Sequence, residues 1–345
     1  MDAACRCENG HSKSDVEVIM NEKLFETPIL FLIFNRPDTT QKVFDQIKLM
    51  KPAKLYVGAD GPRVNKEGEA ELCRQTRDIL QQIDWECELH TLFRERNLGC
   101  DLAVCSEINW FFENENDGII LEDDCVPNQD FFYFCQKMLE KYRSNTKVMM
   151  IGGFNPTPIF DSQYDYYFSS WSSSWGWATW KRAWSLLKET ISDWNTFKQT
   201  VLSNPSLSTY PEFRELVLCD FRGYYHHPHE FPWDGKWANT ILLYNGVCII
   251  PTKNLIMNIG VDGVHYSSKS YSLLLNHPTE SIDYSILSDP ESIIPDIIKD
   301  KDRLILLSGS KKQQLILKIS ALLRRWSIVI DDMHPLMIAR KVMRR

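Results

Sequence analysis

The sequence predicts an α/β fold in which helices cover both faces of a mostly parallel, Rossmann-like sheet. Two observations support this class. Runs that are apolar at almost every position, at residues 29–34 and 118–121, alternate with segments whose apolar residues recur at helical spacing. Strands that are apolar throughout are typical of parallel sheets buried on both faces, and their alternation with helices is typical of strand–helix–strand units.

The first half of the chain provides four such strands, and residues 54–59 and 87–93 are the second and third of them. After the first strand we expect a helix that starts at Asp38, because Asp38 and Gln41 match a capping box. Its buried stripe should consist of Val43, Ile47 and Met50. The next helix should bury one stripe of four side chains: Leu72, Thr76, Ile79 and Ile83.

Composition places the chain among globular proteins with a core of their own. It has 345 residues, of which 43% are hydrophobic, and a formal net charge of -7, which argues against a general nucleic-acid binder. The ten cysteines include no Cys-x-x-Cys pair, so we expect reduced thiols rather than a disulfide scaffold. The sequence has no secretory signal pattern and no apolar run long enough for a membrane span. We therefore expect a cytoplasmic protein.

Polar clusters follow three of the four predicted strands. They are Asn35-Arg36, Asp60 and Glu122-Asp123-Asp124. In open α/β sheets, ligands bind outside the carboxyl ends of the strands. We therefore expect these three clusters to meet at one edge of the sheet.

The acidic cluster at residues 122–124 is unusual because three adjacent carboxylates repel one another unless a cation lies among them. Mn²⁺ and Mg²⁺ favour one or two protein carboxylates together with phosphate oxygens. The triplet therefore predicts a site for a phosphate and a divalent metal. A solvated turn that caps the helix expected over residues 131–142 is the alternative, and the apolar strand before the triplet favours the metal site.

The residues around the triplet resemble a known family. Residues 119–124 (Ile-Ile-Leu-Glu-Asp-Asp), followed by Pro127 and residues 130–132 (Asp-Phe-Phe), resemble the strand and Glu-Asp-Asp motif of GT-A nucleotide-sugar glycosyltransferases. Within that family the similarity is greatest to the N-acetylglucosaminyltransferase I type, the Golgi enzyme that starts hybrid N-glycans, and to its bacterial relatives.

Three earlier motifs fit the same family in order: Phe34-Asn35-Arg36, Gly58-Ala59-Asp60 and the segment 94–99. The resemblance covers residues 28–265. It implies a GT-A fold, in which a nucleotide-sugar-binding half adjoins a smaller acceptor-side subdomain.

The resemblance also implies roles for the matched residues. Arg36 and Asp60 would hold the nucleoside, with Asp60 on the uracil ring, and Asp123 would contact the ribose or the donor sugar. Asp124 would be the direct ligand of the Mn²⁺ or Mg²⁺ that bridges to the diphosphate. Two further residues are assigned to the donor site: Glu122, and Asn97, which stands where the family has a base-contacting residue of another type.

Five of the eleven tryptophans fall within 14 residues: Trp171, Trp175, Trp177, Trp180 and Trp184. The spacing of the last three predicts one helical face, with Trp180 and Trp184 in the core. Trp175 and Trp177 flank Gly176 in a turn, where rigid rings with a polar N–H suit contact with a sugar. This turn resembles the Gly-Trp segment that lines the family's donor–acceptor cleft, and for these two residues both sugar contact and packing stay open.

Residues 231–237 (Phe-Pro-Trp-Asp-Gly-Lys-Trp) resemble the Trp-Asp-Asp-Trp segment that supplies the family's catalytic base. An inverting transferase needs a carboxylate that takes the proton of the acceptor hydroxyl. Asp234 is the expected base and Glu230 its nearby substitute, and capping of the following helix is the alternative role for Asp234. His265 resembles the late histidine that many GT-A enzymes place near the metal; an ordinary loop histidine is the alternative.

The C-terminal segment 311–345 carries nine basic and two acidic residues, and residues 312–330 interleave basic with aliphatic side chains. This pattern is typical of a helix that lies on an anionic membrane surface, and a helix that packs onto the domain is the alternative. The expected organisation has four parts: a flexible lead-in (1–26), a nucleotide-sugar-binding half (27–155), an acceptor-binding half (156–290) and this basic amphipathic end (291–345).

The expected function is a metal-dependent, inverting glycosyltransferase of the hexosyl or N-acetylhexosaminyl kind. It would move a sugar from a nucleotide-diphosphate sugar, with UDP as the expected nucleotide, to a saccharide or lipid-linked saccharide in bacterial surface-polysaccharide assembly. A sugar-nucleotide nucleotidyltransferase is one alternative, but residues 35–38 lack the glycines of its phosphate loop. A non-catalytic carbohydrate-binding protein, suggested by the tryptophans, is the other.

Overall fold

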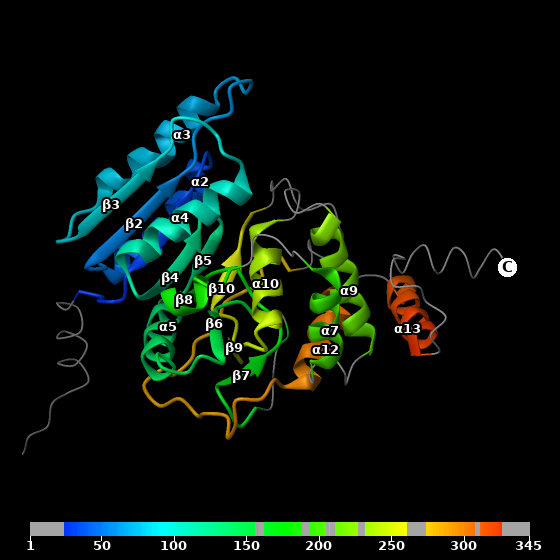
Figure 1. The fold of residues 1–345 in the computed structure, drawn as a ribbon. Coiled ribbons are helices and arrows are strands. Elements are labelled where there is room, and N and C mark those ends of the chain that lie inside the picture. The colour runs from blue at the N-terminus through cyan, green and yellow to red at the C-terminus, as the bar shows by residue number, and fades with distance from the viewer. Residues whose placement is uncertain are drawn as a thin grey trace, which may run out of the picture.

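The predicted apolar runs are adjacent strands in one half of a single eight-stranded sheet (Figure 1). The computed structural model describes residues 24–155, 157, 162–187, 193–204, 207, 211–226, 232–260, 274–307 and 311–325. In chain order the strands of the sheet are β1 (Ile29–Ile33), β2 (Lys54–Ala59), β3 (Glu88–Phe93), β4 (Asp117–Glu122), β6 (Val148–Gly152), β7 (Tyr166–Ser169), β8 (Trp177–Trp180) and β9 (Val247–Pro251). A separate antiparallel ribbon pairs β5 (Cys125–Pro127) with β10 (Ile256–Asn258).

Helices connect these strands and cover the sheet. Within the described residues they are α2 (Pro37–Met50), α3 (Glu69–Asp78), the 3₁₀ turn η1 (Ile79–Gln82), α4 (Cys100–Asn114), α5 (Gln129–Lys141), α6 (Lys181–Trp184), α7 (Trp194–Ser203), α9 (Pro211–His226), α10 (Trp233–Leu243), α12 (Ile297–Leu307) and α13 (Lys311–Arg325).

The strand order across the sheet is β3-β2-β1-β4-β8-β6-β9-β7. β3, β2, β1 and β4 are parallel to one another, and β9 is parallel to β6. β8 runs antiparallel between β4 and β6, and β7 is antiparallel to β9 at the far edge. The prediction of a mostly parallel sheet is therefore confirmed, and the sheet is continuous across residue 155, where the two halves were expected to meet.

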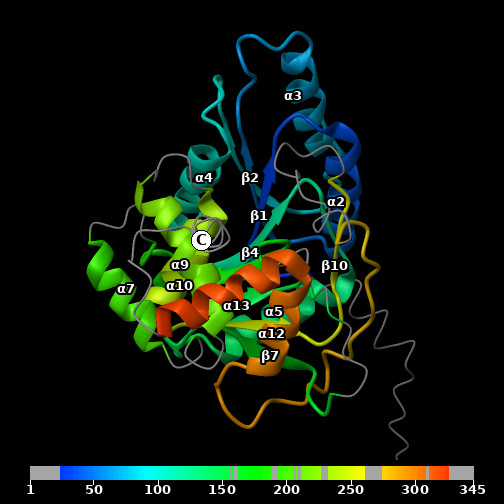
Figure 2. The same ribbon diagram turned by 90° about the vertical axis from the view of Figure 1, so that its right-hand side faces the viewer.

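Strand β1 shows why its residues are apolar throughout. Ile29, Phe31 and Ile33 belong to a hydrophobic cluster with α2 and α5, whereas Leu30 and Leu32 belong to a second cluster with α4 and α10. Figures 1 and 2 together place α2 and α4 on opposite sides of the sheet. The expectation of helices on both faces is confirmed, and these two layers hold the strand ends rigidly in place.

The capping box predicted for the first helix is wrong. Helix α2 begins at Pro37, its N-cap is Arg36, and no side chain caps it. Proline suits the first helical position because its φ is already helical and the N–H that it lacks would have no partner there. Asp38 therefore lies inside the first turn. The predicted buried stripe of this helix is confirmed: Val43, Ile47 and Met50 are all buried.

In helix α3 the predicted stripe is partly wrong. Leu72 is 40% exposed, while Thr76 in α3 and Ile79 in η1 are buried as expected and Ile83 is partly buried. Cys73 is buried instead of Leu72. The third strand also differs from the expectation, since β3 is the edge of the sheet and alternates between exposed and partly buried side chains.

The tryptophan block is a strand followed by one helical turn, not the continuous helix that the spacing predicts. Trp177 and Trp180 lie in β8, and only Trp184 lies in the short helix α6. Trp180 and Trp184 are buried, as expected. The spacing is misleading because β8 is buried on both faces, so its tryptophans follow no periodicity of exposure.

The C-terminal helix α13 packs against α9. It buries one face on the domain: Ile316, Leu317, Ser320 and Ala321. Leu315, Lys318 and Leu322 lie on the exposed face. Among the residues that the structure describes, no helix has the length and apolar character needed to cross a membrane. The remainder of the predicted basic end, residues 326–345, lies outside them.

Gly176 provides a test of how the tryptophan turn is built. Its φ is +62°, and a Cβ there would lie 2.4 Å from Cδ1 of Ile256. We expect Gly176→Ala to lower the free energy of unfolding by about 3 kcal/mol, since it adds both backbone strain and overpacking. Gly68→Ala is the matched control, because Gly68 also has a positive φ but a Cβ there would meet nothing within 4 Å. Gly68→Ala should lower the free energy of unfolding, measured by urea denaturation, by only about 1 kcal/mol. Equal losses would contradict the role of Ile256.

Candidate functional site

The predicted polar clusters do meet at one edge of the sheet. β2, β1 and β4 are adjacent and parallel, so their carboxyl ends lie side by side. Arg36 follows β1, Asp60 follows β2, and the acidic triplet follows β4. Side-chain contacts join two of the clusters, because Arg36 reaches across to the triplet, whereas Asp60 is placed beside them by the adjacency of β2 and β1. The strand order thus assembles groups that are almost 90 residues apart in the chain.

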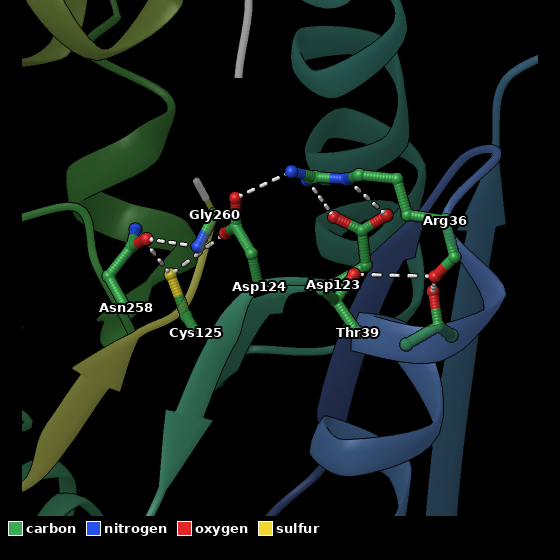
Figure 3. A network of polar contacts seen from close by, with 8 residues as sticks. Arg36, Thr39, Asp123, Asp124, Cys125, Asn258 and Gly260 are labelled. Atoms are coloured by element: carbon green, nitrogen blue, oxygen red, sulfur yellow. Dashed lines mark hydrogen bonds and ion pairs between the residues drawn. The ribbon is translucent and has the colours of Figure 1, made fainter. Parts of the chain in front are cut away.

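Arg36 binds two of the three acids (Figure 3). Its Nη2 and Nε donate to the two carboxylate oxygens of Asp123, with 3.3 Å for the Nε contact, and its Nη1 donates to Oδ2 of Asp124 at 2.9 Å. Asp123 is 3% exposed and Asp124 is 7% exposed. A guanidinium that pairs in this forked way gives strong, directional hydrogen bonds. Arg36 is therefore the counter-charge that allows these carboxylates to be buried.

The pKa values of two of these acids are nevertheless raised. Burial raises the pKa of Asp123, and Arg36 opposes that shift. Burial also raises the pKa of Glu122 well above its ordinary value, and the neighbouring carboxylates of Asp124, Asp234 and Asp123 raise it further. Such excess negative charge is what an incoming cation would relieve.

The ribbon of β5 and β10 supports the acids from the other side. The thiol of Cys125 donates to Oδ1 of Asp124 at 3.4 Å, and Asn258 contacts the same sulfur (Figure 3). The backbone N–H of Gly260 donates to the Asn258 side chain. A Cβ at Gly260 would lie only 2.2 Å from Oδ2 of Asp124. Glycine is required there because Asp124 occupies the space of a side chain.

Asp60 is engaged by its own chain. Its carboxylate accepts hydrogen bonds from the backbone N–H groups of Gly61, Leu98 and Gly99 and from Nδ2 of Asn97, at 2.8 to 3.2 Å. A carboxylate has about four lone-pair sites, so protein donors satisfy this one. In this structure Asp60 and Asn97 therefore order the 97–99 loop.

The two tryptophans that flank Gly176 differ in burial. Trp177 is fully buried and packs against Trp184, Trp233 and Trp237, so its ring belongs to the core and the alternative of sugar contact is corrected for this residue. Trp175 is only partly buried and lines a cavity of about 300 Å³. The difference arises because Trp177 starts a central strand, whereas Trp175 precedes the positive-φ glycine.

The cavity brings Asp234 to the same place as Trp175. Its walls come from the serine-rich segment 170–174, from α10 and from single residues such as Phe154 and Arg303. Asp234 is an exposed residue in the first turn of α10 and lines the cavity. The cavity volume is at the lower end of the range typical of ligand pockets.

Asp234 also lies near the acidic triplet. The carboxylate of Asp234 is one of the neighbouring charges that raise the pKa of Glu122. A buried Lys236 anchors the helix, since its Nζ donates to Oδ2 of Asp101 at 2.5 Å. The expected alternative, that Asp234 caps α10, is wrong because Pro232 is the N-cap.

Two predicted residues, Glu230 and His265, lie outside the described residues, so their assignments stay predictions. Sequence reasoning also missed functional candidates. Glu107 is buried in α4 against Gly58 of β2, and Lys236 fixes α10. Glu107 belongs to no motif, and Lys236 lies within the 231–237 motif, but the position of each depends on a residue far away in the chain. The Ser-rich segment 170–174 was visible as composition, but its place in the cavity wall depends on the tertiary fold.

The ligand atoms of the acidic residues determine which metal ion the site suits. Asp123 and Asp124 offer carboxylate oxygens, which suit Mg²⁺ and Mn²⁺. Within the described part of the chain, no group of three or more His, Cys, Asp or Glu side chains is arranged to hold a metal ion. Two carboxylates suit a cation that completes its ligands with phosphate oxygens and water.

No protein-family model matches this sequence, and no curated protein matches it. Among solved structures, the mannosyltransferase PcManGT from Pyrobaculum calidifontis, in complex with GDP-Man and Mn²⁺, is similar over 63% of this chain and 74% of that chain. The two have 12% sequence identity and a TM-score of 0.33. A likeness at this level carries no functional conclusion. The resemblance to the GT-A family and to its N-acetylglucosaminyltransferase I type stays a prediction.

Removal of Arg36 tests its role as counter-charge. Arg36→Met should lower the free energy of unfolding by about 3 kcal/mol at neutral pH, because two buried carboxylates lose their partner. Arg36→Met combined with Asp123→Asn should recover part of this loss, since the amide leaves one fewer unpaired charge. Urea denaturation of the two variants measures the effect. Additive losses in the double variant would contradict the coupling.

Proposed function

We propose that this protein is a metal-dependent glycosyltransferase of the GT-A kind. It transfers a sugar from a nucleotide-diphosphate sugar, with UDP as the favoured nucleotide, to a saccharide acceptor. The observation that carries the proposal is the convergence of Arg36, the Asp60 loop and the 122–124 acids at the carboxyl edge of four parallel strands. That edge is where open α/β sheets bind nucleotides.

The donor half of the site has two parts. The 97–99 loop, which Asp60 orders, lies next to β2 and is the part that we assign to the base or ribose. Arg36 and the acids lie beside it and suit the diphosphate with its cation. Asp123 and Asp124 would hold Mn²⁺ or Mg²⁺, which when bound neutralises the negative charge that develops on the departing diphosphate.

The acceptor half is the cavity that Trp175 and Asp234 line. An aromatic face beside serine hydroxyls suits a sugar, which is apolar on its ring face and polar at its edges. Asp234 would accept the proton of the attacking hydroxyl as the acceptor oxygen bonds to the anomeric carbon. The bond from that carbon to the diphosphate oxygen breaks at the same time. A single displacement of this kind inverts the anomeric centre.

The exposed face of α13 suggests where the acceptor is found. Leu315, Lys318 and Leu322 are exposed on this helix. A helix face that combines basic and aliphatic side chains suits an anionic membrane. This supports a lipid-linked saccharide as the acceptor and a cytoplasmic enzyme at the inner face of the membrane.

The metal and nucleotide components are tested together by thermal shift. UDP with Mn²⁺ should raise the melting temperature of the wild-type protein because ligands that bind the folded state stabilise it. Asp124→Asn should abolish the part of the shift that requires Mn²⁺. Asp302→Asn is the matched control, since Asp302 is exposed on α12. If no nucleoside diphosphate shifts the wild type with any divalent cation, the proposal fails and a carbohydrate-binding protein is favoured.

The base role of Asp234 is tested by kinetics. Once a donor and an acceptor are identified from a hydrolysis and transfer panel, Asp234→Asn should lower kcat by about 10²- to 10⁴-fold and leave the donor KM nearly unchanged. The donor KM should stay because Asp234 lies on the cavity side of the site. A variant with wild-type kcat would exclude Asp234 as the base.

A further inference from the structure

The buried end of the cavity carries polar groups that the proposed reaction does not use. Five residues of α10 line the cavity: Asp234, Gly235, Ala238, Asn239 and Leu242. Their spacing is helical, so one face of α10 forms this wall. Asp234 is exposed, whereas Asn239, which lies about 7.5 Å further along the helix axis, is 5% exposed. The wall therefore runs from an exposed end at Asp234 to a buried end at Asn239.

The amide of Asn239 has a donor without a partner. Its Nδ2 is buried and donates to no residue in the part of the chain that the structure describes. Buried polar side chains usually have a hydrogen-bond partner, because a buried donor that lacks one keeps the full cost of leaving water. Gly235 and Ala238, on the same face of α10, are too small to provide a partner. An unpaired donor in the wall of a cavity points to an oxygen atom of a ligand.

Helix α12 contributes a guanidinium to the same cavity. Arg303 lines it and is only 5% exposed. Its Nη2 donates to the backbone carbonyl of Ser172 at 2.9 Å, so the guanidinium lies against the serine-rich segment that forms this wall. Arginine stays protonated in proteins, and its planar fork of N–H donors matches the oxygens of carboxylates and phosphates.

Asp300 is a neighbouring acid on α12, and the charges of Asp300 and Arg303 act on each other. The Asp300 carboxylate accepts hydrogen bonds from the Ser169 hydroxyl and from the backbone N–H of Ser170, so it holds the start of the serine-rich segment. Asp300 is not among the described residues that line the cavity, and of those residues Arg303 and Asp234 are the charged ones. An occupant therefore meets a carboxylate at the exposed end and a guanidinium on the buried wall.

We propose that the saccharide that binds in this cavity carries an anionic group, a carboxylate or a phosphate, and that Arg303 and Asn239 bind this group. Trp175 then contacts the face of the sugar ring, and the hydroxyl that reacts lies at the exposed end beside Asp234. The identity of this saccharide as the acceptor rests on the proposed function, whereas the binding of an anionic sugar does not.

A neutral saccharide explains less of the cavity. A hydroxyl oxygen would accept from Asn239, but it would not need a buried guanidinium in the same cavity, and burying a charge is costly. A hydrogen bond in which both partners are charged is also stronger than one with a neutral hydroxyl. The pairing of Asn239 with Arg303 therefore favours an anionic group.

The first measurement is ligand-observed nuclear magnetic resonance without nucleotide or metal. Glucuronate, glucose 6-phosphate and glucose are titrated separately, and at least one of the two anionic sugars should bind about tenfold more tightly than glucose. The tighter of the two identifies a carboxylate or a phosphate as the group. Arg303→Met should remove the preference, and Lys301→Met, at an exposed position of the same helix, should retain it. Equal affinities for the three sugars, or no binding of either anionic sugar, would overturn the proposal.

Asn239→Asp tests the buried end with almost no change in shape, and it also serves if Arg303→Met does not fold. A carboxylate at position 239 should repel the anionic sugar and lower its affinity by about tenfold or more, with little change for glucose. Melting temperatures of both variants are measured first. If Asn239→Asp folds and retains the wild-type preference, the anionic sugar binds elsewhere and the proposal is wrong.

Thermal shift with UDP and Mn²⁺ on the same proteins separates this inference from the proposed function. If UDP with Mn²⁺ stabilises the wild type but the sugars show no preference for an anion, the inference fails and the proposed function stands. If the preference is present and depends on Arg303, but no nucleoside diphosphate binds, the anionic-sugar site stands and the proposed function fails.

Discussion

The burial of consecutive carboxyl groups at the end of β4 is the constraint on which the rest of the site depends. β4 is a central strand, so its carboxyl end carries Glu122, Asp123 and Asp124 into the interior edge of the sheet instead of into solvent. Unpaired charges there would cost several kcal/mol each. Arg36 offsets part of that cost because β1 is the neighbour of β4 and delivers its own end to the same place. The remaining negative charge makes the edge receptive to a cation.

The antiparallel strand β8 connects the carboxyl end of β4 to the second half of the chain. Because β8 runs antiparallel between β4 and β6, the turn that precedes it lies near the carboxyl end of β4. That turn carries Trp175, and α10 brings Asp234 to the same cavity. Lys236 of α10 donates a hydrogen bond to Asp101 of α4, so the two halves contact each other through these helices as well as through the sheet. The strand-end cluster and the cavity are thereby built on one continuous sheet.

The sequence was sufficient to predict the parallel sheet, its two helical layers and the meeting of Arg36 with the acids, because unbroken apolar strands and strand-end clusters are local signals. It was insufficient where tertiary context decides. Trp177 and Trp180 have helical spacing but lie in a buried strand, where spacing carries no information about exposure. Asp60 reads as a ligand contact, yet distant backbone donors occupy it. The burial of Glu107 gave no signal, since it depends on Gly58 on another element.

We propose that these carboxylates take a divalent cation only together with a diphosphate, because Mg²⁺-like ions are usually bound through one or two carboxylates plus substrate phosphate oxygens. Electron paramagnetic resonance of Mn²⁺ tests it most directly, since the signal of the free aquo ion is lost on binding. We expect about one Mn²⁺ bound per chain in the presence of UDP or GDP, and almost none without a nucleotide. Tight Mn²⁺ binding without any nucleotide, or no binding with either diphosphate, would contradict the claim.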